Sequence, residues 1–270
     1  MNLSLLRQQP HLSASSITTY IDCSLQYYFS RVKKVPIEFV SDNLAFGTAI
    51  HSTLADYYRA KMIGDRLALK DVHELFRQSW RKEAEGRGEM IRYDEGKDFK
   101  NLLTDGSELL SAWFNTKLPE DDFTVIGIEE AFSFNDPNLP APIIGAMDLV
   151  EIDSAGTVVI TDFKTANKAY SRDQIDQNMQ VTIYGMACKS NGYADREILL
   201  KLDCLIKTQK KKFESYWTTR SETDEKRLIR KAQKIWNAIS NAAFVPNDTS
   251  WKCKGCQYKQ ACDRWFMEGE

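Results

Sequence analysis

Two acids and a lysine are the residues of this chain best suited to chemistry. Asp162 and Lys164 end an apolar run with only Phe163 between them, and Asp148 ends another apolar segment fourteen residues upstream. Carboxylate oxygens are the ligands that Mg²⁺ and Mn²⁺ prefer in proteins. An ammonium beside such an ion can orient or help to deprotonate a water, or stabilise negative charge that develops on a phosphate. The spacing therefore predicts a divalent-metal site of the kind that hydrolyses phosphodiesters.

The strand and helix periods indicate which side chains share this site. Side chains two residues apart on a strand point to the same face, so Lys164 is expected beside Asp162, with the backbone carbonyl of Phe163 pointing nearby as a further ligand. Gln180 and Tyr184 are spaced i and i+4 on a predicted helix, so they share one face and could contact a phosphate or fix the lysine. An ordinary polar helix face is the alternative interpretation of that pair.

His51, near the start of another predicted helix, is a candidate third metal ligand. An imidazole ligand would favour Mn²⁺ over Mg²⁺. A single histidine on a helix is more often a packed or surface residue, so this assignment depends on the other motifs.

The cysteines predict a second, separate site. Cys253, Cys256 and Cys262 lie close together near the C-terminus, and the candidates for a fourth ligand are Cys23, Cys188 and Cys204. Cys188 and Cys204 lie in apolar segments and are expected to be buried as small hydrophobic residues. Cys23 lies among polar residues at the other end of the chain. Four thiolates suit zinc or an iron–sulfur cluster.

Four lysines form a candidate nucleic-acid contact between two predicted strands: Lys207, Lys210, Lys211 and Lys212. Such a group can follow a phosphate backbone, although a solvated hairpin tip is the commoner explanation. The net charge of −2 gives no support for nucleic-acid binding by the chain as a whole, so any such contact must be local.

The elements that must position these residues follow from hydrophobic periodicity and turn signals. Helices are predicted over residues 13–32, 43–62, 70–85, 97–117, 174–190 and 221–243. Strands are predicted over residues 123–134, 143–152, 157–165, 198–207 and 213–219. This order predicts one α/β domain over residues 1–270, with a mostly helical arm or insertion (1–120), a core (121–220) and an irregular cysteine-rich tail (244–270).

Length and composition are those of a globular intracellular protein. The chain has 270 residues, of which 43% are hydrophobic and 27% charged, and no apolar run approaches the roughly 20 residues of a membrane helix. The N-terminus lacks the pattern of a secretory signal. We therefore expect a cytoplasmic location with no membrane contact, where thiols stay reduced and serve as metal ligands more readily than as disulfides.

Five motifs in a fixed order resemble the PD-(D/E)XK nuclease superfamily. They are Ser13-x2-Ser16-x3-Tyr20-x2-Cys23, Gly47-x3-His51, Gly145-x2-Asp148, Asp162-Phe163-Lys164 and Gln180-x3-Tyr184. The branch they resemble is the RecB-like group, which includes the nuclease domains of RecB and AddB and the CRISPR-associated iron–sulfur nucleases. The resemblance implies a restriction-endonuclease-like core, a central mixed sheet flanked by helices. It also implies that His51, Asp148 and Asp162 bind Mg²⁺ or Mn²⁺, that Lys164 is the catalytic lysine, and that Gln180 and Tyr184 support it.

The same resemblance implies a cofactor and an activity. Cys23 would join Cys253, Cys256 and Cys262 around a structural [4Fe–4S] cluster, with Zn²⁺ as the alternative, so that the tail closes on the N-terminal region. The activity would be metal-dependent DNA exonuclease action on single strands or linear duplex ends, in repair, recombination or CRISPR-type processing. A helicase, recombination or CRISPR protein could be its partner. The alternatives are a catalytically inactive nuclease fold that binds DNA or a partner, and a zinc-stabilised interaction module.

Overall fold

A five-stranded mixed sheet forms the centre of the computed structural model, which describes residues 2–117 and 122–268. The strands are β3 (Thr124–Phe134), β4 (Ile143–Ile152), β5 (Val158–Ala166), β6 (Ile198–Ile206) and β7 (Lys212–Thr218), in that spatial order. Only β5 and β6 run parallel, and the other neighbours are antiparallel. The α/β class and the mixed sheet are thus confirmed, whereas the predicted boundary at residues 120–121 lies outside the described residues.

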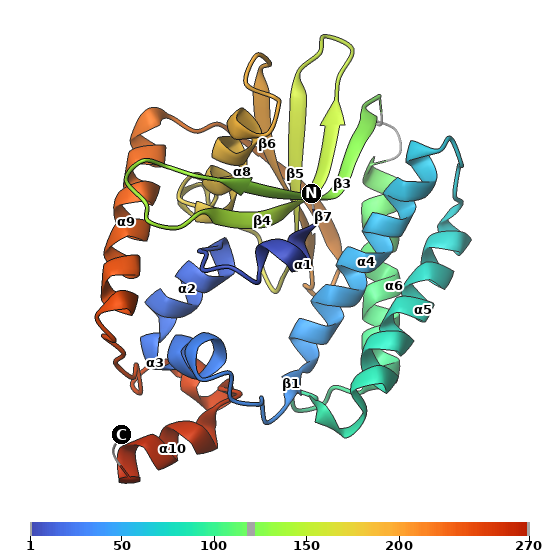
Figure 1. Cartoon of the computed structure of the whole chain (residues 1–270). Helices are drawn as coiled ribbons and strands as arrows, with labels where there is room; N and C mark the ends of the chain where they lie inside the picture. Colours follow the sequence, from blue (N-terminus) through green and yellow to red (C-terminus); the bar gives the residue numbers. More distant parts are fainter. Residues whose placement is uncertain (1, 118–121, 269–270) are drawn as a thin grey trace.

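Helices cover both faces of the sheet (Figure 1). On one face lie α4 (Asp42–Met62), α5 (Leu69–Arg87) and α6 (Phe99–Lys117). On the other lie α2 (Ala14–Asp22), α8 (Met179–Ser190) and α9 (Glu222–Ser240). The shorter elements are α1 (Leu3–Leu6), α3 (Ser24–Tyr27), a π-helical turn (Tyr28–Val32), the strand pair β1 (Val40–Ser41) and β2 (Ile91–Arg92), α7 (Arg172–Asp176), α10 (Lys259–Glu268) and two 3₁₀ turns (Gly88–Met90 and Trp251–Gly255).

Each face of the sheet has its own hydrophobic core. The core under α4–α6 holds Phe46, Trp80 and Trp113, which pack with Phe163 of β5. The core under α8 and α9 includes Ile160 and neighbouring aliphatic residues of the sheet. Each such fully buried side chain contributes about 1.5–3 kcal/mol. Because the central strand is covered on both sides, its apolar residues form a nearly continuous run.

A buried ion network lies on the α6 side of the sheet. The ammonium of Lys201 lies 3.5 Å from Asp203 Oδ2 and 3.9 Å from Glu151 Oε2, and all three side chains are fully buried. Burial alone would lower the pKa of Lys201, but the two carboxylates outweigh it and raise that pKa. The network holds Lys201 in its charged form inside the protein.

Three predicted elements differ from the structure. The helix predicted over 13–32 breaks at Cys23, whose backbone is extended (φ −164°, ψ 107°) between α2 and α3. The helix predicted over 174–190 breaks after α7, because Asn178 caps a new helix by accepting a hydrogen bond from the backbone of Val181. The tail is partly regular, since it contains a 3₁₀ turn and α10. Local hydrogen bonding by polar residues at the breaks competes with helix continuation.

No helix in the described part of the chain combines the length and the apolar character needed to span a membrane.

Candidate active site

The two acids lie where β4 and β5 separate. These strands pair from Ile152 and Val158 as far as Leu149 and Thr161, one position short of Asp148 and Asp162 in the same register. Beyond this point β5 continues beside β6, and β4 continues beside β3. Oδ2 of Asp148 accepts a hydrogen bond from the backbone N–H of Phe163 at 2.9 Å, so a side chain replaces the strand ladder there. Beside this split a cavity is lined by Asp148, whereas Asp162 is buried.

Strand alternation sets the direction of the catalytic candidates on β5. Phe163 points into the α4–α6 core, where its ring stacks on Tyr58 with centroids 5.9 Å apart. Asp162 and Lys164 point to the opposite face, and Oδ2 of Asp162 lies 2.8 Å from Nζ of Lys164. The predicted pairing of these two side chains is therefore present in the structure.

Lys164 is held by two partners. Its ammonium donates to Oε1 of Gln180 at 2.8 Å as well as contacting Asp162. Burial lowers the pKa of Lys164, but the hydrogen bond and charge of Asp162, together with the charge of Asp148, outweigh that effect and the net pKa is raised. The lysine is therefore an ammonium at neutral pH. In this state it can stabilise negative charge but cannot accept a proton from water.

The carboxyl group of Asp148 has a raised pKa. Burial, followed by repulsion from Asp162, raises the pKa of Asp148 from 3.8 to about 6. Its Oδ2 lies 3.4 Å from Nδ1 of His51 on α4. The predicted metal ligands His51, Asp148 and Asp162 are thus brought together from three elements, α4, β4 and β5.

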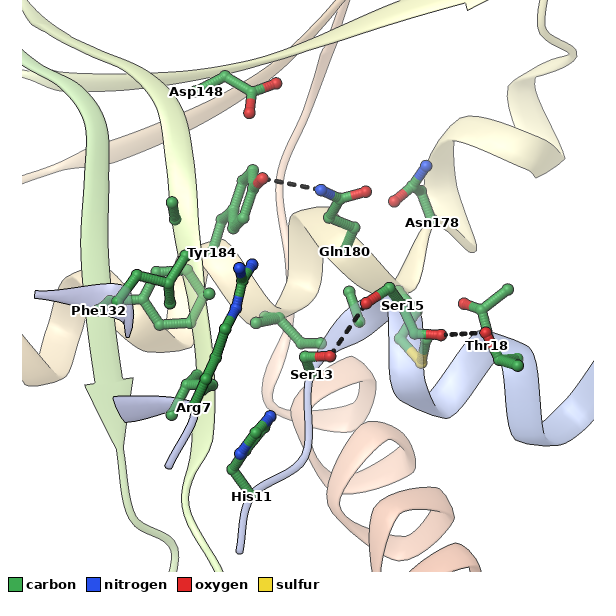
Figure 2. Close-up of a pocket in the computed structure, with 18 of the residues that line it drawn as sticks. Arg7, His11, Ser13, Ser15, Thr18, Phe132, Asp148, Asn178, Gln180 and Tyr184 are labelled. Carbon is green, nitrogen blue, oxygen red and sulfur yellow. Dashed lines mark hydrogen bonds between the residues drawn. The ribbon is translucent and has the colours of Figure 1, made fainter. Parts of the chain in front are cut away.

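Gln180 and Tyr184 face Asp148 from α8, as Figure 2 shows. Nε2 of Gln180 donates to the Tyr184 hydroxyl at 2.8 Å. The Tyr184 ring packs edge-on against Phe132 with centroids 5.9 Å apart. A Cβ on Gly145 would lie only 2.6 Å from the Phe132 ring, so the glycine before Asp148 lets this aromatic pair approach the strand.

The acidic group fits a hard divalent cation by two observations. Oδ1 of Asp162 is buried without a hydrogen-bond partner within the described residues, and burial, followed by repulsion from Asp162, raises the pKa of Asp148. A cation between them would satisfy both. In the described ranges no three His, Cys, Asp or Glu side chains lie close enough to hold a metal ion by themselves.

Three of the four predicted cluster cysteines gather at the junction of the two chain ends. Cys23, Cys256 and Cys262 pack on one small hydrophobic cluster that includes Tyr28 and Tyr258. Burial, with repulsion from neighbouring cysteines including Cys23, raises the pKa of the Cys256 and Cys262 thiols. All six cysteines are free thiols. Cys188 and Cys204 are buried in the sheet core, as predicted.

Hydrogen bonds between the chain ends position this group. Ser24 Oγ donates to the carbonyl of Val245 at 3.0 Å, and Asn247 Nδ2 donates to the carbonyl of Asp22 at 2.8 Å. The Sγ of Cys253 lies 3.2 Å from the carbonyl of Asn247. The donor chemistry of the four thiols suits a soft metal or an iron–sulfur cluster.

The four-lysine group adjoins the end of β6. Lys207 donates to Oδ1 of Asn43 at 2.7 Å, and Lys211 pairs with Asp105 at 2.7 Å. Lys210 and Lys212 are exposed. Two of the four lysines are therefore engaged with α4 and α6.

A cavity of about 640 Å³ opens beside Asp148. Most of the residues that line it are not among those predicted from the sequence. Its far side is formed by the N-terminal region, including Arg7, His11 and Arg31. None of these three residues lies in a recognisable motif. They come near Asp148 only because the N-terminal region, with α1 and α2, packs against the sheet. Only the basic residue types could have suggested them.

Comparison with known proteins places the chain in a family. The model of the PD-(D/E)XK nuclease superfamily matches residues 11–263. The chain belongs to this superfamily.

A solved structure shares the fold at low sequence identity. A Eubacterium rectale protein solved as a "putative exonuclease" aligns with a TM-score of 0.57 and 10% identity, covering 91% of this chain and 87% of its own. The structure of SSO0001 aligns with a TM-score of 0.39 and 14% identity, covering 92% of this chain and 95% of its own. No curated protein matches the sequence.

Proposed function

We propose that this protein is a metal-dependent deoxyribonuclease that acts as an exonuclease on single-stranded or linear duplex DNA. One observation carries the proposal: Asp148 and Asp162 meet at the split between β4 and β5, with Lys164 2.8 Å from Asp162. The family supports the reaction class, and the exonuclease mode agrees with the name given to the similar structure, a "putative exonuclease". A role in repair, recombination or CRISPR-type processing, with a helicase or similar partner, remains our prediction from the motifs.

Each residue of the proposed site has a separate role in hydrolysis. Asp148, Asp162, His51 and the carbonyl of Phe163 would hold Mg²⁺ or Mn²⁺, which supplies Lewis acidity to the phosphate and to a water. Lys164, kept protonated by Asp162, stabilises the negative charge that develops on the phosphate oxygens. Gln180 fixes the ammonium through its 2.8 Å hydrogen bond.

Tyr184 acts one step further from the reaction. Its hydroxyl accepts from Nε2 of Gln180, which sets the amide so that Oε1 faces Lys164. Burial raises the pKa of Tyr184 well above its ordinary value, so the phenol stays neutral and keeps this role.

We further propose that Cys23, Cys253, Cys256 and Cys262 bind a [4Fe–4S] cluster, with Zn²⁺ as the alternative. The shared hydrophobic cluster and the mutual repulsion of the thiols support a bound cationic centre. The role would be structural, because joining Cys23 to the tail closes a very long loop in the unfolded chain.

Cleavage of end-labelled DNA tests the proposed reaction. The wild type should degrade a single strand with Mg²⁺ or Mn²⁺ and stop on addition of EDTA. Asp162→Asn should lose at least about a hundredfold in rate, since the metal and Lys164 both depend on that carboxylate.

The matched control is Asp195→Asn, which changes an exposed acid in the turn before β6. It should cleave like the wild type. Cleavage that survives EDTA, or equal activity of the two variants, would refute the assignment of the metal site.

A further inference from the structure

The cavity beside Asp148 is lined by more basic than acidic side chains, unlike the chain as a whole. Besides the neutral phenol of Tyr184, its ionisable lining residues are Arg7, His11, Arg31 and Asp148, whereas the chain as a whole carries a net charge of −2. The single acid belongs to the metal site already described. The rest of the wall combines basic and polar groups with apolar side chains such as Leu3, Ile144 and Ile183, so that, apart from Asp148, its charge suits an anion.

The two arginines are available for a ligand. Arg7 and Arg31 are both exposed, and neither forms an ion pair or side-chain hydrogen bond with the described residues. Figure 2 shows the guanidinium of Arg7 pointing along the cavity towards the end where Asp148, Gln180 and Tyr184 lie. An unpaired guanidinium aimed at a nuclease centre is suited to a phosphate, which it can bind through two parallel hydrogen bonds.

Two helices also begin at this cavity. Ser13 caps α2, Asn178 caps α8, and both caps line the cavity together with Ser15 and Met179 from the first turns. The positive ends of two helix dipoles thus add to the charge of the arginines. The two helices come from distant parts of the chain, so their convergence is a property of the fold.

We propose that this cavity binds the unpaired DNA strand next to the phosphate that is cleaved, and that Arg7 and Arg31 hold its backbone. The inference deepens the proposed nuclease function and rests on it. A volume of about 640 Å³ falls within the roughly 300–1,000 Å³ of small-ligand pockets. Such a space takes nucleotides of one strand and excludes a duplex, so the N-terminal wall makes the enzyme select single-stranded ends.

This surface differs from the four-lysine group beyond β6. Lys207 and Lys211 there contact Asn43 and Asp105, whereas both cavity arginines remain unpaired within the described residues. The cavity is also continuous with the catalytic acids, since Asp148 and Gln180 form part of its lining.

Binding without cleavage tests the proposal. Fluorescence anisotropy in EDTA would measure the affinity of fluorescein-labelled oligothymidylate for the wild type, Arg7→Ala, Arg31→Ala and the double variant. Each substitution should weaken binding about tenfold, the loss of one charge-assisted contact. The double variant should reduce the slope of log K against log salt by about 1.4, or 0.7 for each phosphate contact on a single strand. A blunt duplex should bind the wild type at least about tenfold more weakly.

The control is Arg66→Ala, which removes an exposed arginine lining a separate cavity beside α4 and α5. It should bind oligothymidylate like the wild type. Unchanged affinity of the double variant, or equal binding of duplex and single strand, would overturn the proposal even if the wild type cleaves DNA. Arginine-dependent binding by a wild type that fails to cleave with any metal would uphold the cavity and refute the nuclease function.

Discussion

Replacing Asp148 with asparagine should stabilise the metal-free protein while removing its activity. Burial and the nearby Asp162 raise the pKa of Asp148 from 3.8 to about 6. At about 1.36 kcal/mol per pH unit, the ionised side chain then lowers the free energy of unfolding by at most about 3 kcal/mol. The side chain is 19% exposed, so water screens part of this, and we expect Asp148→Asn to gain about 1–3 kcal/mol above pH 6.

Proton linkage determines how the stability difference between the wild type and Asp148→Asn changes with pH. Between about pH 4 and pH 6 native Asp148 binds more protons than the unfolded chain does, so the stability of the wild type falls as pH rises through this window. Asparagine cannot ionise, and its side-chain oxygen can still accept the hydrogen bond from Phe163 N–H. The advantage of the variant should therefore be absent near pH 4 and complete above about pH 6.

Urea unfolding in EDTA across this pH range measures the effect. The gain at pH 8 should also raise the melting temperature by roughly 2–8 °C, scaled for a protein of this size. Excess Mg²⁺ should stabilise the wild type and close the gap, while Asp195→Asn should follow the wild type throughout. A variant that is no more stable than the wild type at pH 8, or an advantage independent of pH, would refute this reasoning.

Three further predictions follow from other parts of the molecule. Lys201→Met removes the ammonium between buried Glu151 and Asp203 and should lower the free energy of unfolding by about 3–5 kcal/mol in urea; a loss below about 1 kcal/mol would contradict the network. Gln180→Ala should lower kcat at least about tenfold while the protein stays folded, because the amide positions the proposed catalytic lysine; wild-type kcat would contradict this role. Cys256→Ser should lower the iron and sulfide bound per chain and the melting temperature; full iron content would contradict the assigned ligand set.

The periods of strand and helix predicted which side chains of the candidate site lie on the same face. The same-face placement of Asp162 and Lys164 follows from the period of two in a strand, and that of Gln180 and Tyr184 from the helix spacing. Both relations hold in the structure. They are recoverable from sequence because each depends on backbone geometry over fewer than five residues.

Longer-range features were not predictable in this way. The separation of β4 and β5 at Asp148 coincides with a side-chain hydrogen bond from Phe163 N–H, which has no sequence signature. The break at Cys23 interrupts a segment whose composition suits a continuous helix. Arg7 and Arg31 approach the acids only because the N-terminal region packs on the sheet, and no periodicity encodes that docking.

The decisive measurement for the proposed metal-dependent nuclease site is a comparison of two variants, Lys164→Ala and Lys168→Ala. The quantity measured is the rate at which each cleaves end-labelled single-stranded DNA in the presence of the metal. Lys168 follows on the same segment but is exposed, so the two variants remove the same group inside and outside the site. We expect the cleavage rate of Lys164→Ala to fall about 10²–10³-fold and that of Lys168→Ala to equal the wild-type rate. Equal rates for the two variants, or no cleavage by a folded wild type that binds Mn²⁺, would contradict it.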